Sequence, residues 1–267
     1  MFVNGVHLNI KKTGSGPPIL ALHGFAGNMS TWDNFVEEAR TSYAVITIDL
    51  LGHGASDCPV DVERYSPEHT IADIATALRK LRISRPCLLG YSMGGRLALL
   101  AAVSHPSMPR CLILEGASPG LESPSARKRR MRRDTFLARM IMEEGVETFS
   151  SYWEKRPLFK SQRSLPLSIR KRIREERVRN NPVGLANTLR AANPGAQPPV
   201  HKLLPKLKIP VLCIVGEHDY KFKAIATAMC GELPHGRLVV IQGAGHAVHI
   251  EKPREFNRAV FDFLREI

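Results

Sequence analysis

The chain of 267 residues is long enough to bury a large core, and its content of 43% hydrophobic and 24% charged residues is ordinary for a soluble globular protein. No apolar run is long enough to cross a bilayer, and the first residues lack a secretory signal, so we expect no membrane insertion and a cytoplasmic location. The five cysteines are scattered and never form Cys-x-x-Cys, which indicates neither a disulfide framework nor a zinc site.

Short apolar strands alternate with helices in the first 121 residues. Residues 1–10 predict a hairpin that turns at Asn4-Gly5, and Ser30 followed by Asp33 predicts the start of a helix. Further strands are expected at residues 19–22, 43–48, 86–89 and 110–114, and further helices at residues 68–82 and 93–104. This alternation predicts a mostly parallel sheet covered by helices on both faces.

Residues 122–204 break the alternation. They hold no convincing strand but several helical stretches, which are separated by Pro157, Pro166, Pro182 and Pro194. The alternation resumes with strands at residues 211–215 and 238–241, a helix from about Phe222 and a last helix from Pro253. We predict an α/β core formed by residues 1–121 and 205–267, with a helical cap inserted at residues 122–204.

The formal net charge of +13 could indicate nucleic-acid binding, but the charges are unevenly distributed. Residues 122–190 hold 18 Lys and Arg against 8 Asp and Glu, so most of the excess lies in one quarter of the chain. This segment lacks the interleaved aromatic residues of a single-strand-binding surface. We therefore expect no nucleic-acid partner, a mostly solvated basic surface, and a minority of cations that line a pocket for an anionic substrate.

The segment Gly90-Tyr91-Ser92-Met93-Gly94 lies between an apolar strand and an alanine-rich helix. This context is typical of a nucleophile elbow, a sharp turn that exposes a serine at the N-terminus of a helix. The strained turn needs small residues beside it, and Gly90 and Gly94 meet that need. Free amides and the helix dipole at this end favour developing negative charge. The motif predicts a catalytic Ser92, and a merely structural turn is the alternative.

A serine needs a base to take its proton. Among ten histidines, His246 is the best candidate because it follows the last expected strand in Gly-Ala-Gly-His; His249 is its rival and is expected to pack at the start of the final segment. Asp219, which also follows a strand end, would orient the imidazole, and Glu217 is the local alternative. The order Ser92, Asp219, His246 is that of the α/β-hydrolase fold.

The early segment His23-Gly24-Phe25 follows a strand and leads into a helix, which is where this fold supplies one amide of an oxyanion hole. We expect that amide to be the Phe25 N–H, with the Met93 N–H as the second. His23 and His53 are expected to support loop structure. Neither has metal-ligand spacing with supporting carboxylates, so no metal site is predicted.

Several segments of the chain recur together in one subfamily of the α/β hydrolases. They are Gly-Tyr-Ser-Met-Gly-Gly-Arg at residues 90–96, residues 115–121, Arg-Met-Arg-Arg-Asp at 130–134, Tyr152-Trp153 with Pro157-Leu158-Phe159, and residues 177–181. On these segments the chain resembles the 2-succinyl-6-hydroxy-2,4-cyclohexadiene-1-carboxylate synthases of menaquinone biosynthesis. The resemblance covers nearly the whole chain, including the cap.

The resemblance implies a carbon–oxygen lyase that eliminates pyruvate from 2-succinyl-5-enolpyruvyl-6-hydroxy-3-cyclohexene-1-carboxylate without a cofactor. Ser92, activated by His246 and Asp219, would abstract a ring proton. The amides of Phe25 and Met93 would stabilise the charge that moves onto the succinyl carbonyl oxygen.

The implied substrate is a small tricarboxylate. Arg96 lies one helical turn after Ser92, so its planar guanidinium could clamp one carboxylate; a salt bridge to a neighbouring acid is the alternative. The resemblance further implies that Arg130 and Arg177 bind the other carboxylates and that Tyr91 and Trp153 add contacts.

Two other functions are compatible with these motifs. The first is a serine esterase or carbon–carbon bond hydrolase that acts on an anionic substrate. The second is a binding protein that keeps the hydrolase fold without catalysis, although such proteins often lose members of the triad. The sequence leaves open whether the protein forms a homo-oligomer.

Overall fold

A seven-stranded sheet forms the centre of the computed structural model, which describes all 267 residues. The strand order is β3-β5-β4-β6-β7-β8-β9, and every pairing is parallel except that of β3 with β5. The bounds are β3 Ile10–Thr13, β4 Pro18–Leu22, β5 Ala44–Ile48, β6 Cys87–Tyr91, β7 Cys111–Glu115, β8 Val211–Gly216 and β9 Gly236–Ile241. Every residue of β5, β7 and β8 is buried, as expected for parallel strands that are covered on both faces.

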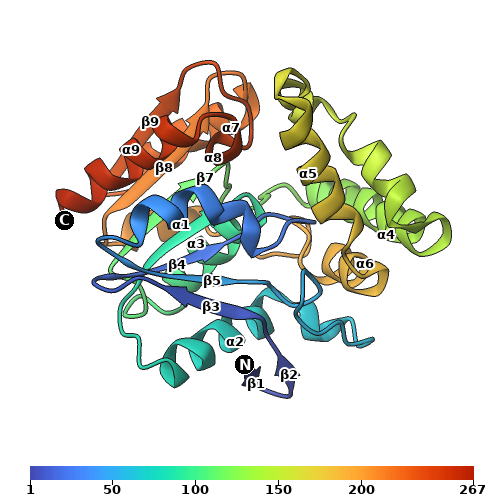
Figure 1. Cartoon of the computed structure of the whole chain (residues 1–267), viewed down its shortest axis with the longest axis horizontal. Helices are drawn as coiled ribbons and strands as arrows, with labels where there is room; N and C mark the ends of the chain where they lie inside the picture. Colours follow the sequence, from blue (N-terminus) through green and yellow to red (C-terminus); the bar gives the residue numbers. More distant parts are fainter.

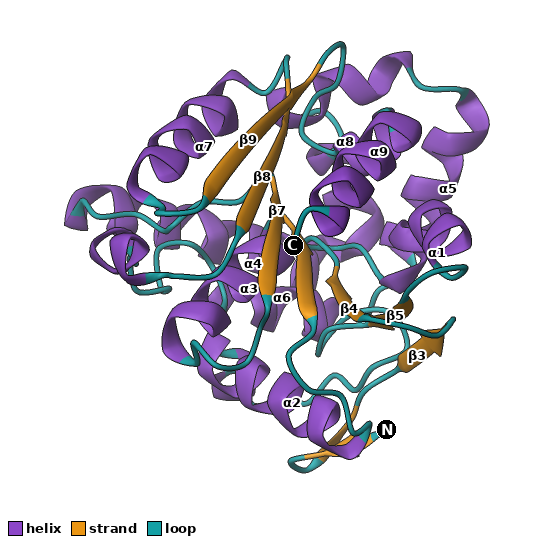
Figure 2. Ribbon diagram, turned by 90° about the vertical axis from the view of Figure 1, so that its left-hand side faces the viewer, coloured by secondary structure: helices purple, strands orange, loops and turns teal.

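Helices cover both faces of this sheet (Figure 1). One face packs against α2 Pro67–Lys80, α3 Met93–Ser104 and α7 Tyr220–Glu232, and the other against α1 Asp33–Ala39, α8 Val248–Glu251 and α9 Pro253–Arg265. In Figure 2, α7 and α9 lie on opposite sides of β8. Alternate residues of a strand enter the two cores: Leu88 packs in the first, and its neighbours Cys87 and Leu89 pack in the second.

Five helical segments lie between β7 and β8 in the chain, and we call the first four of them the insertion. They are α4 Pro124–Trp153, which is interrupted at Gly145 (φ 85°), η3 Pro157–Ser164, α5 Leu167–Val178 and α6 Pro182–Ala191. The insertion has a hydrophobic cluster of its own, which includes Leu137, Phe149 and Leu185. Figure 1 shows α4, α5 and α6 gathered on one side of the molecule. None of the helices is both long enough and apolar enough to cross a membrane.

Two local predictions are wrong. The helix expected from Ser30 is preceded by a 3-10 helix, η1 Met29–Trp32, whose N-cap is Asn28; the Asn28 side chain accepts from the Ser30 amide at 2.9 Å and so takes the capping role. The hairpin of β1 Phe2–Val3 and β2 Val6–His7 turns at Asn4-Gly5 as expected, but residues 8 and 9 leave it, and Ile10 begins β3 at the edge of the main sheet.

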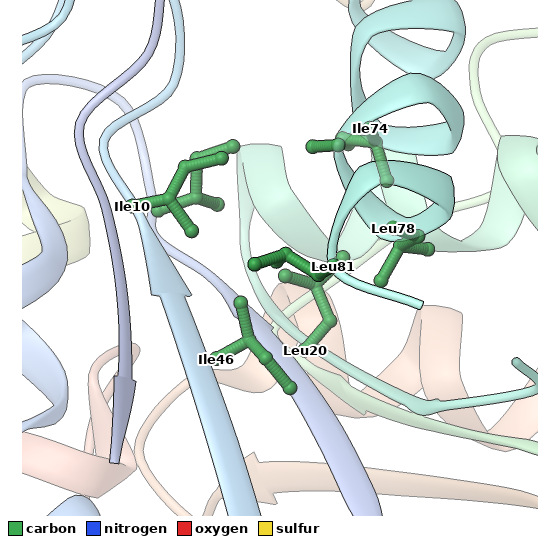
Figure 3. A pocket seen from close by; sticks show the side chains of 8 residues that line it. Ile10, Leu20, Ile46, Ile74, Leu78 and Leu81 are labelled. Atoms are coloured by element: carbon green, nitrogen blue, oxygen red, sulfur yellow. The ribbon is translucent and has the colours of Figure 1, made fainter. Parts of the chain in front are cut away.

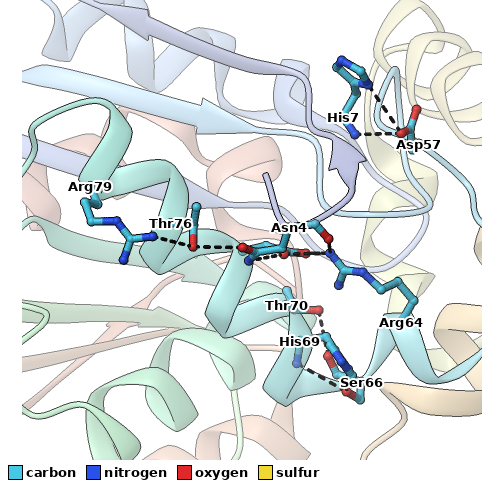
Figure 4. Close-up of polar contacts among 10 residues, drawn as sticks. Asn4, His7, Asp57, Arg64, Ser66, His69, Thr70, Thr76 and Arg79 are labelled. Atoms are coloured by element: carbon cyan, nitrogen blue, oxygen red, sulfur yellow. Dashed lines mark hydrogen bonds and ion pairs between the residues drawn. The ribbon is translucent and has the colours of Figure 1, made fainter. Parts of the chain in front are cut away.

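The hairpin is tied to α2 by polar contacts (Figure 4). The buried Asp73 carboxylate accepts from Asn4 Nδ2 at 2.9 Å and from Arg64 Nη2 at 2.8 Å. Arg64 also donates to the Asn4 carbonyl oxygen at 3.2 Å. The remaining short segments are η2 Glu63–Tyr65 and η4 His201–Lys206.

A small gap remains between α2 and strands β3, β4 and β5 (Figure 3). Its volume is about 10 Å³, and all eight lining residues are hydrophobic, Leu20, Ile46 and Ile74 among them. A bound water needs about this much space and at least two polar partners. The gap is therefore a packing defect of the core rather than a binding site.

Candidate active site

Ser92 connects β6 to α3 in a backbone conformation that residues with side chains rarely adopt, with φ 51° and ψ −102°. Its glycine neighbours allow the close approach of three segments. A Cβ on Gly90 would lie 2.5 Å from the Gly94 carbonyl, and one on Gly94 would lie 2.2 Å from the Leu22 carbonyl oxygen. The sharp turn expected from the motif is present, and tight packing holds its strained backbone.

Three side chains form a continuous hydrogen-bonded unit at the carboxyl ends of the strands. His246 Nδ1 lies 2.6 Å from Asp219 Oδ2, and His246 Nε2 lies 3.1 Å from Ser92 Oγ. A carboxylate can only accept, so Nδ1 carries the hydrogen and Nε2 is free to accept from the serine hydroxyl. His246 and Asp219 are buried. This arrangement can deprotonate a serine or, through it, another acid.

The rival residues lie elsewhere. Glu217 accepts from the Gly243 amide at 2.9 Å, which braces the loop after β9. The buried His249 ring contacts the Glu115 carboxylate through Nδ1 at 2.8 Å and Thr31 Oγ1 through Nε2 at 2.7 Å. His23 accepts from the Leu50 amide at 3.0 Å. Each of these side chains is already bonded within the protein and none is bonded to Ser92.

Two backbone amides beside Ser92 are free to bind an anion. The Met93 N–H is the first of α3, so it lies outside the hydrogen-bond ladder of the helix. The Phe25 N–H, in the loop after β4, has no acceptor within the protein. Both residues line the same cavity as Ser92. Their placement suits a two-amide oxyanion hole.

This cavity has a volume of about 1160 Å³ and lies between the core and the insertion. Ser92, Met93 and Gly116 line it from the core, and Trp153 and Leu189 line it from the insertion. The volume is ample for a small organic substrate. The lining carries only two acids, Asp134 and Asp219, against the following Lys and Arg residues: Arg96, Arg130, Arg133, Arg156, Lys160, Arg163 and Lys221.

Arg96 is the most deeply buried of these cations. Its Nη1 donates to Gln197 Oε1 at 2.5 Å and its Nη2 to the Ala192 carbonyl oxygen at 3.0 Å. Burial, and then the charge of Arg130, lower the pKa of Arg96 to about 9, and Asp134 opposes this shift. No carboxylate forms an ion pair with it, so the structure excludes the alternative of a salt bridge to a neighbouring acid.

The other residues implied to bind substrate are placed differently. Arg130 lines the cavity and donates from Nε to Asp134 Oδ2 at 2.6 Å; Trp153 lines it too, with its ring edge-on to Phe25. Arg177 is buried within the insertion, where Nη1 donates to Ser150 Oγ at 3.3 Å.

Neither Arg177 nor Tyr91 is part of the cavity lining. Arg177 pairs weakly with Glu154, at 4.0 Å. Tyr91 packs its ring between those of His246 and His249, with centroids at 5.3 and 4.8 Å. Direct contact of either residue with a substrate therefore requires the cavity wall to shift.

Comparisons with known proteins agree with this geometry. The model of the α/β hydrolase fold matches residues 17–253. A Bacillus subtilis (strain 168) protein is 42% identical over 93% of this chain and 90% of its own length; its name, 2-succinyl-6-hydroxy-2,4-cyclohexadiene-1-carboxylate synthase, is provisional. The synthase of that name from Enterobacter sp. (strain 638) is 32% identical over 99% of this chain and 97% of its own.

The chain belongs to this synthase family within the α/β hydrolases. A solved structure of MenH from S. aureus is similar with a TM-score of 0.92 and 34% identity, over 97% of this chain and 98% of that one, so the likeness includes the insertion. A thermophilic esterase from Thermogutta terrifontis is similar with a TM-score of 0.86 and 28% identity, over 98% of this chain and 94% of that one.

Sequence reasoning missed several residues of this synthase-family site. Glu251 accepts from the Gly245 amide at 2.7 Å and the Ala247 amide at 3.4 Å, and so brackets His246. Gln197 and the cavity cations Arg133, Arg156, Lys160, Arg163 and Lys221 were also missed as site residues. Four of these cations lie in the basic segment, but no local signal separates lining from solvated side chains.

No group of His, Cys, Asp or Glu side chains in the structure could hold a metal ion.

Proposed function

We propose that the protein converts 2-succinyl-5-enolpyruvyl-6-hydroxy-3-cyclohexene-1-carboxylate into 2-succinyl-6-hydroxy-2,4-cyclohexadiene-1-carboxylate and pyruvate. The observation that carries the proposal is a serine–histidine–aspartate unit at the floor of a cavity with a large excess of cations. A substrate with three carboxylates suits that cavity, and a neutral acyl ester does not. Membership of the synthase family supports the same reaction.

The first step is removal of the proton from ring carbon 2, which carries the succinyl group. His246 Nε2 accepts the Ser92 proton, and the serine oxygen takes the proton from carbon. Asp219 holds the imidazole in the tautomer that this transfer requires and stabilises the imidazolium. The electron pair of the broken C–H bond moves into the succinyl carbonyl, whose oxygen becomes negative.

The second step is loss of the enolpyruvyl group from ring carbon 5. The amides of Phe25 and Met93 stabilise the enolate oxygen while it exists. Its electron pair returns to form a double bond between ring carbons 2 and 3, the existing double bond shifts from carbons 3 and 4 to carbons 4 and 5, and the C5–O bond to the leaving group breaks. The departing enolpyruvate regains a proton from the serine–histidine pair and becomes pyruvate. The reaction needs no cofactor because the conjugated carbonyl holds the charge.

The cations would hold the three carboxylates. Arg96, one turn along α3 from Ser92, and Arg130, from the insertion, both line the cavity, and their guanidinium groups suit carboxylates. We propose that Trp153 contacts the ring, and that Arg177 and Tyr91 contribute once residues 122–204 close as a cap over the core of residues 1–121 and 205–267. We also propose a cytoplasmic location, because all five cysteines are free thiols.

The test is incubation of the purified protein with the enolpyruvyl substrate, with pyruvate and the absorbance of the cyclohexadiene followed together. We expect both products in equal amounts from the wild type and almost none from Ser92→Ala. The competing reading, hydrolysis of an anionic ester, predicts an acyl group on Ser92 that forms and decays at the turnover rate. Its detection by quenched-flow mass spectrometry, without pyruvate release, would contradict the proposal.

A further inference from the structure

The guanidinium of Arg96 is anchored without being neutralised. Both of its partners, Gln197 Oε1 and the Ala192 carbonyl oxygen, are uncharged. The side chain is only 8% exposed, and a buried charge is costly unless an opposite charge pairs with it. The single buried acid nearby, Asp134, bonds to Arg130 and not to Arg96. The two arginines therefore have one carboxylate between them, it pairs with Arg130, and the charge of Arg96 remains unpaired.

Gln197 is poorly satisfied by this arrangement. The residue is fully buried, its Oε1 accepts from Arg96, and its Nε2 has no hydrogen-bond partner. A glutamate at this position would have the same shape, would neutralise Arg96 and would lose no hydrogen bond. We therefore expect a glutamate at this position to stabilise the fold at least as well as the glutamine does. Local arrangements that are poor for stability occur mainly at functional sites.

The loop that carries Gln197 is braced by hydrogen bonds. Asn193 Oδ1 accepts from the Gly195 amide at 2.8 Å and from the Ala196 amide at 2.9 Å, and Asn193 Nδ2 donates to the Leu189 carbonyl oxygen at 3.0 Å. Arg127, on α4, also donates from Nε to the Gly195 carbonyl oxygen at 2.8 Å. The two oxygens that hold Arg96 come from the two ends of this braced loop, so the guanidinium has a fixed orientation.

We propose that Gln197 is a positioning residue that decides the anion specificity of the site. It fixes the orientation of the Arg96 guanidinium in the cavity wall. Because Gln197 is neutral, the charge of Arg96 stays unpaired and can bind a carboxylate of the substrate. The identity of that anion rests on the proposed function, but the role of Gln197 does not. The carboxylate becomes the missing counter-ion of a buried arginine, which makes its binding stronger than at a solvated cation.

Three variants test this proposal. Gln197→Glu keeps the shape and neutralises Arg96, Gln197→Met removes the accepting oxygen and leaves the charge, and Asn34→Asp, at an exposed position on α1, controls for the change in net charge. For each we would measure the melting temperature, the kcat and KM of pyruvate release, and the calorimetric affinity for tricarballylate, a simple tricarboxylate, at low ionic strength.

Gln197→Glu should melt at or above the wild-type temperature, yet lose about 100-fold in kcat/KM, mainly through KM, and at least about tenfold in tricarballylate affinity. Gln197→Met should melt lower but lose less affinity than Gln197→Glu. Asn34→Asp should match the wild type. If Gln197 served only the stability of the fold, the order would be reversed: Gln197→Met, the less stable variant, would lose more activity and affinity than Gln197→Glu.

Wild-type affinity for tricarballylate in Gln197→Glu, or a greater loss of affinity in Gln197→Met, would overturn the proposal. Absence of binding to the wild type would overturn it as well, because the site would then hold no tricarboxylate. Melting and binding need no turnover. If the wild type released no pyruvate, the proposed function would fail while these two measurements still decided the role of Gln197.

Discussion

Arg96 stands on a stretch of α3 whose other side chains are apolar and buried. Leu97, Ala98 and Leu99 are each at most 2% exposed, so α3 packs on all sides and a charge within it is costly. Burial of the Arg96 charge lowers the stability of the fold, and this loss is tolerated if the charge binds the substrate. Because its two partners are neutral oxygens, removal of the arginine should affect substrate binding more than it affects folding.

Arg96→Ala should lower kcat/KM by roughly 30- to 1000-fold, which corresponds to about 2–4 kcal/mol of lost transition-state binding. Arg96→Lys keeps the charge without the two-pronged fork and should be intermediate. Kinetics and melting temperature should be measured on the same preparations. An Arg96→Ala protein that melts far lower but turns over normally would rule out the carboxylate clamp.

The serine–histidine–aspartate unit should behave as one catalytic device. Ser92→Ala, His246→Ala and Asp219→Asn should each lower kcat by about 10²- to 10⁴-fold while circular dichroism shows a folded protein. Because the three groups act together, the double variant of Ser92 and His246 should be little worse than either single one. Near-wild-type turnover in Ser92→Ala of verified sequence would contradict the mechanism.

At the scale of elements, the loop between β9 and α8 is held by carboxylates as well as by the packing of Ala244 in the core. Its residues Gly243, Ala244 and Gly245 have little side chain to pack. Glu251 accepts from the amides on both sides of His246, and Glu115 at the end of β7 accepts from the backbone and the ring of His249. The position of the His246 ring thus depends on two acids that do not touch it.

Glu251→Gln should lower kcat by about 10- to 100-fold with little change in KM, because one bracketing hydrogen bond is lost and the imidazole moves relative to Ser92. Glu255→Gln, an exposed acid on α9, is the matched control for the loss of one negative charge. Steady-state kinetics on both variants make the comparison. Equal kcat in the two variants would show that Glu251 does not position His246.

At the scale of the whole molecule, part of the excess of positive charge gathers at one cavity. Arg133, Arg156, Lys160, Arg163 and Lys221 line it in addition to Arg96 and Arg130. Burial is the main cause that lowers the pKa of Lys221, and the charges of Arg130 and Arg133 lower it further. The cations of the cavity are therefore close enough to affect one another. Such a field attracts a multiply charged anion from solution.

We expect kcat/KM to fall several-fold between about 0.02 M and 0.2 M ionic strength, since the Debye length falls from roughly 20 Å to below 10 Å. The value of kcat should change little. Arg133→Gln with Lys221→Gln should flatten this dependence, whereas replacement of two exposed cations on α5, Arg170 and Lys171, should not. A slope unchanged in the first double variant would contradict steering by the cavity cations.

Two buried histidines make the stability of the whole fold sensitive to acid. Burial lowers the pKa of His53 from 6.5 to about 3, and burial also lowers that of His23. The unfolded chain therefore takes up protons below pH 6.5 that the folded chain refuses, so stability falls as pH falls. Between pH 7 and pH 5 the contribution of His53 is about 2 kcal/mol.

The measurement is urea unfolding at pH 7 and pH 5 for the wild type and His53→Asn. Asparagine can replace the donor that His53 directs at the Leu51 carbonyl oxygen, but it does not titrate. The variant should lose about 2 kcal/mol less than the wild type between the two pH values. An equal loss in both proteins would show that His53 is not the titrating group.

The sequence by itself determined the features whose signal is local. The bounds of helix Met93–Ser104 and the sharp turn at Ser92 were predicted and are confirmed, because glycine spacing and an apolar strand–helix junction depend on neighbours in the chain. The hairpin turn at Asn4-Gly5 was found for the same reason. The order of serine, aspartate and histidine could be read because all three follow strands of a parallel sheet, whose carboxyl ends meet at one edge.

The tertiary structure alone decided which charged residues act together. Gln197 and Ala192 lie about 100 residues from Arg96 in the chain, and Glu115 lies 134 residues from His249, so no spacing rule connects them. Likewise, α4 and α5 carry arginines on several sides, and only the packing of the insertion on the core selects those that line the cavity. Charge and periodicity are local properties, whereas burial and pairing depend on contacts between segments that chain folding brings together.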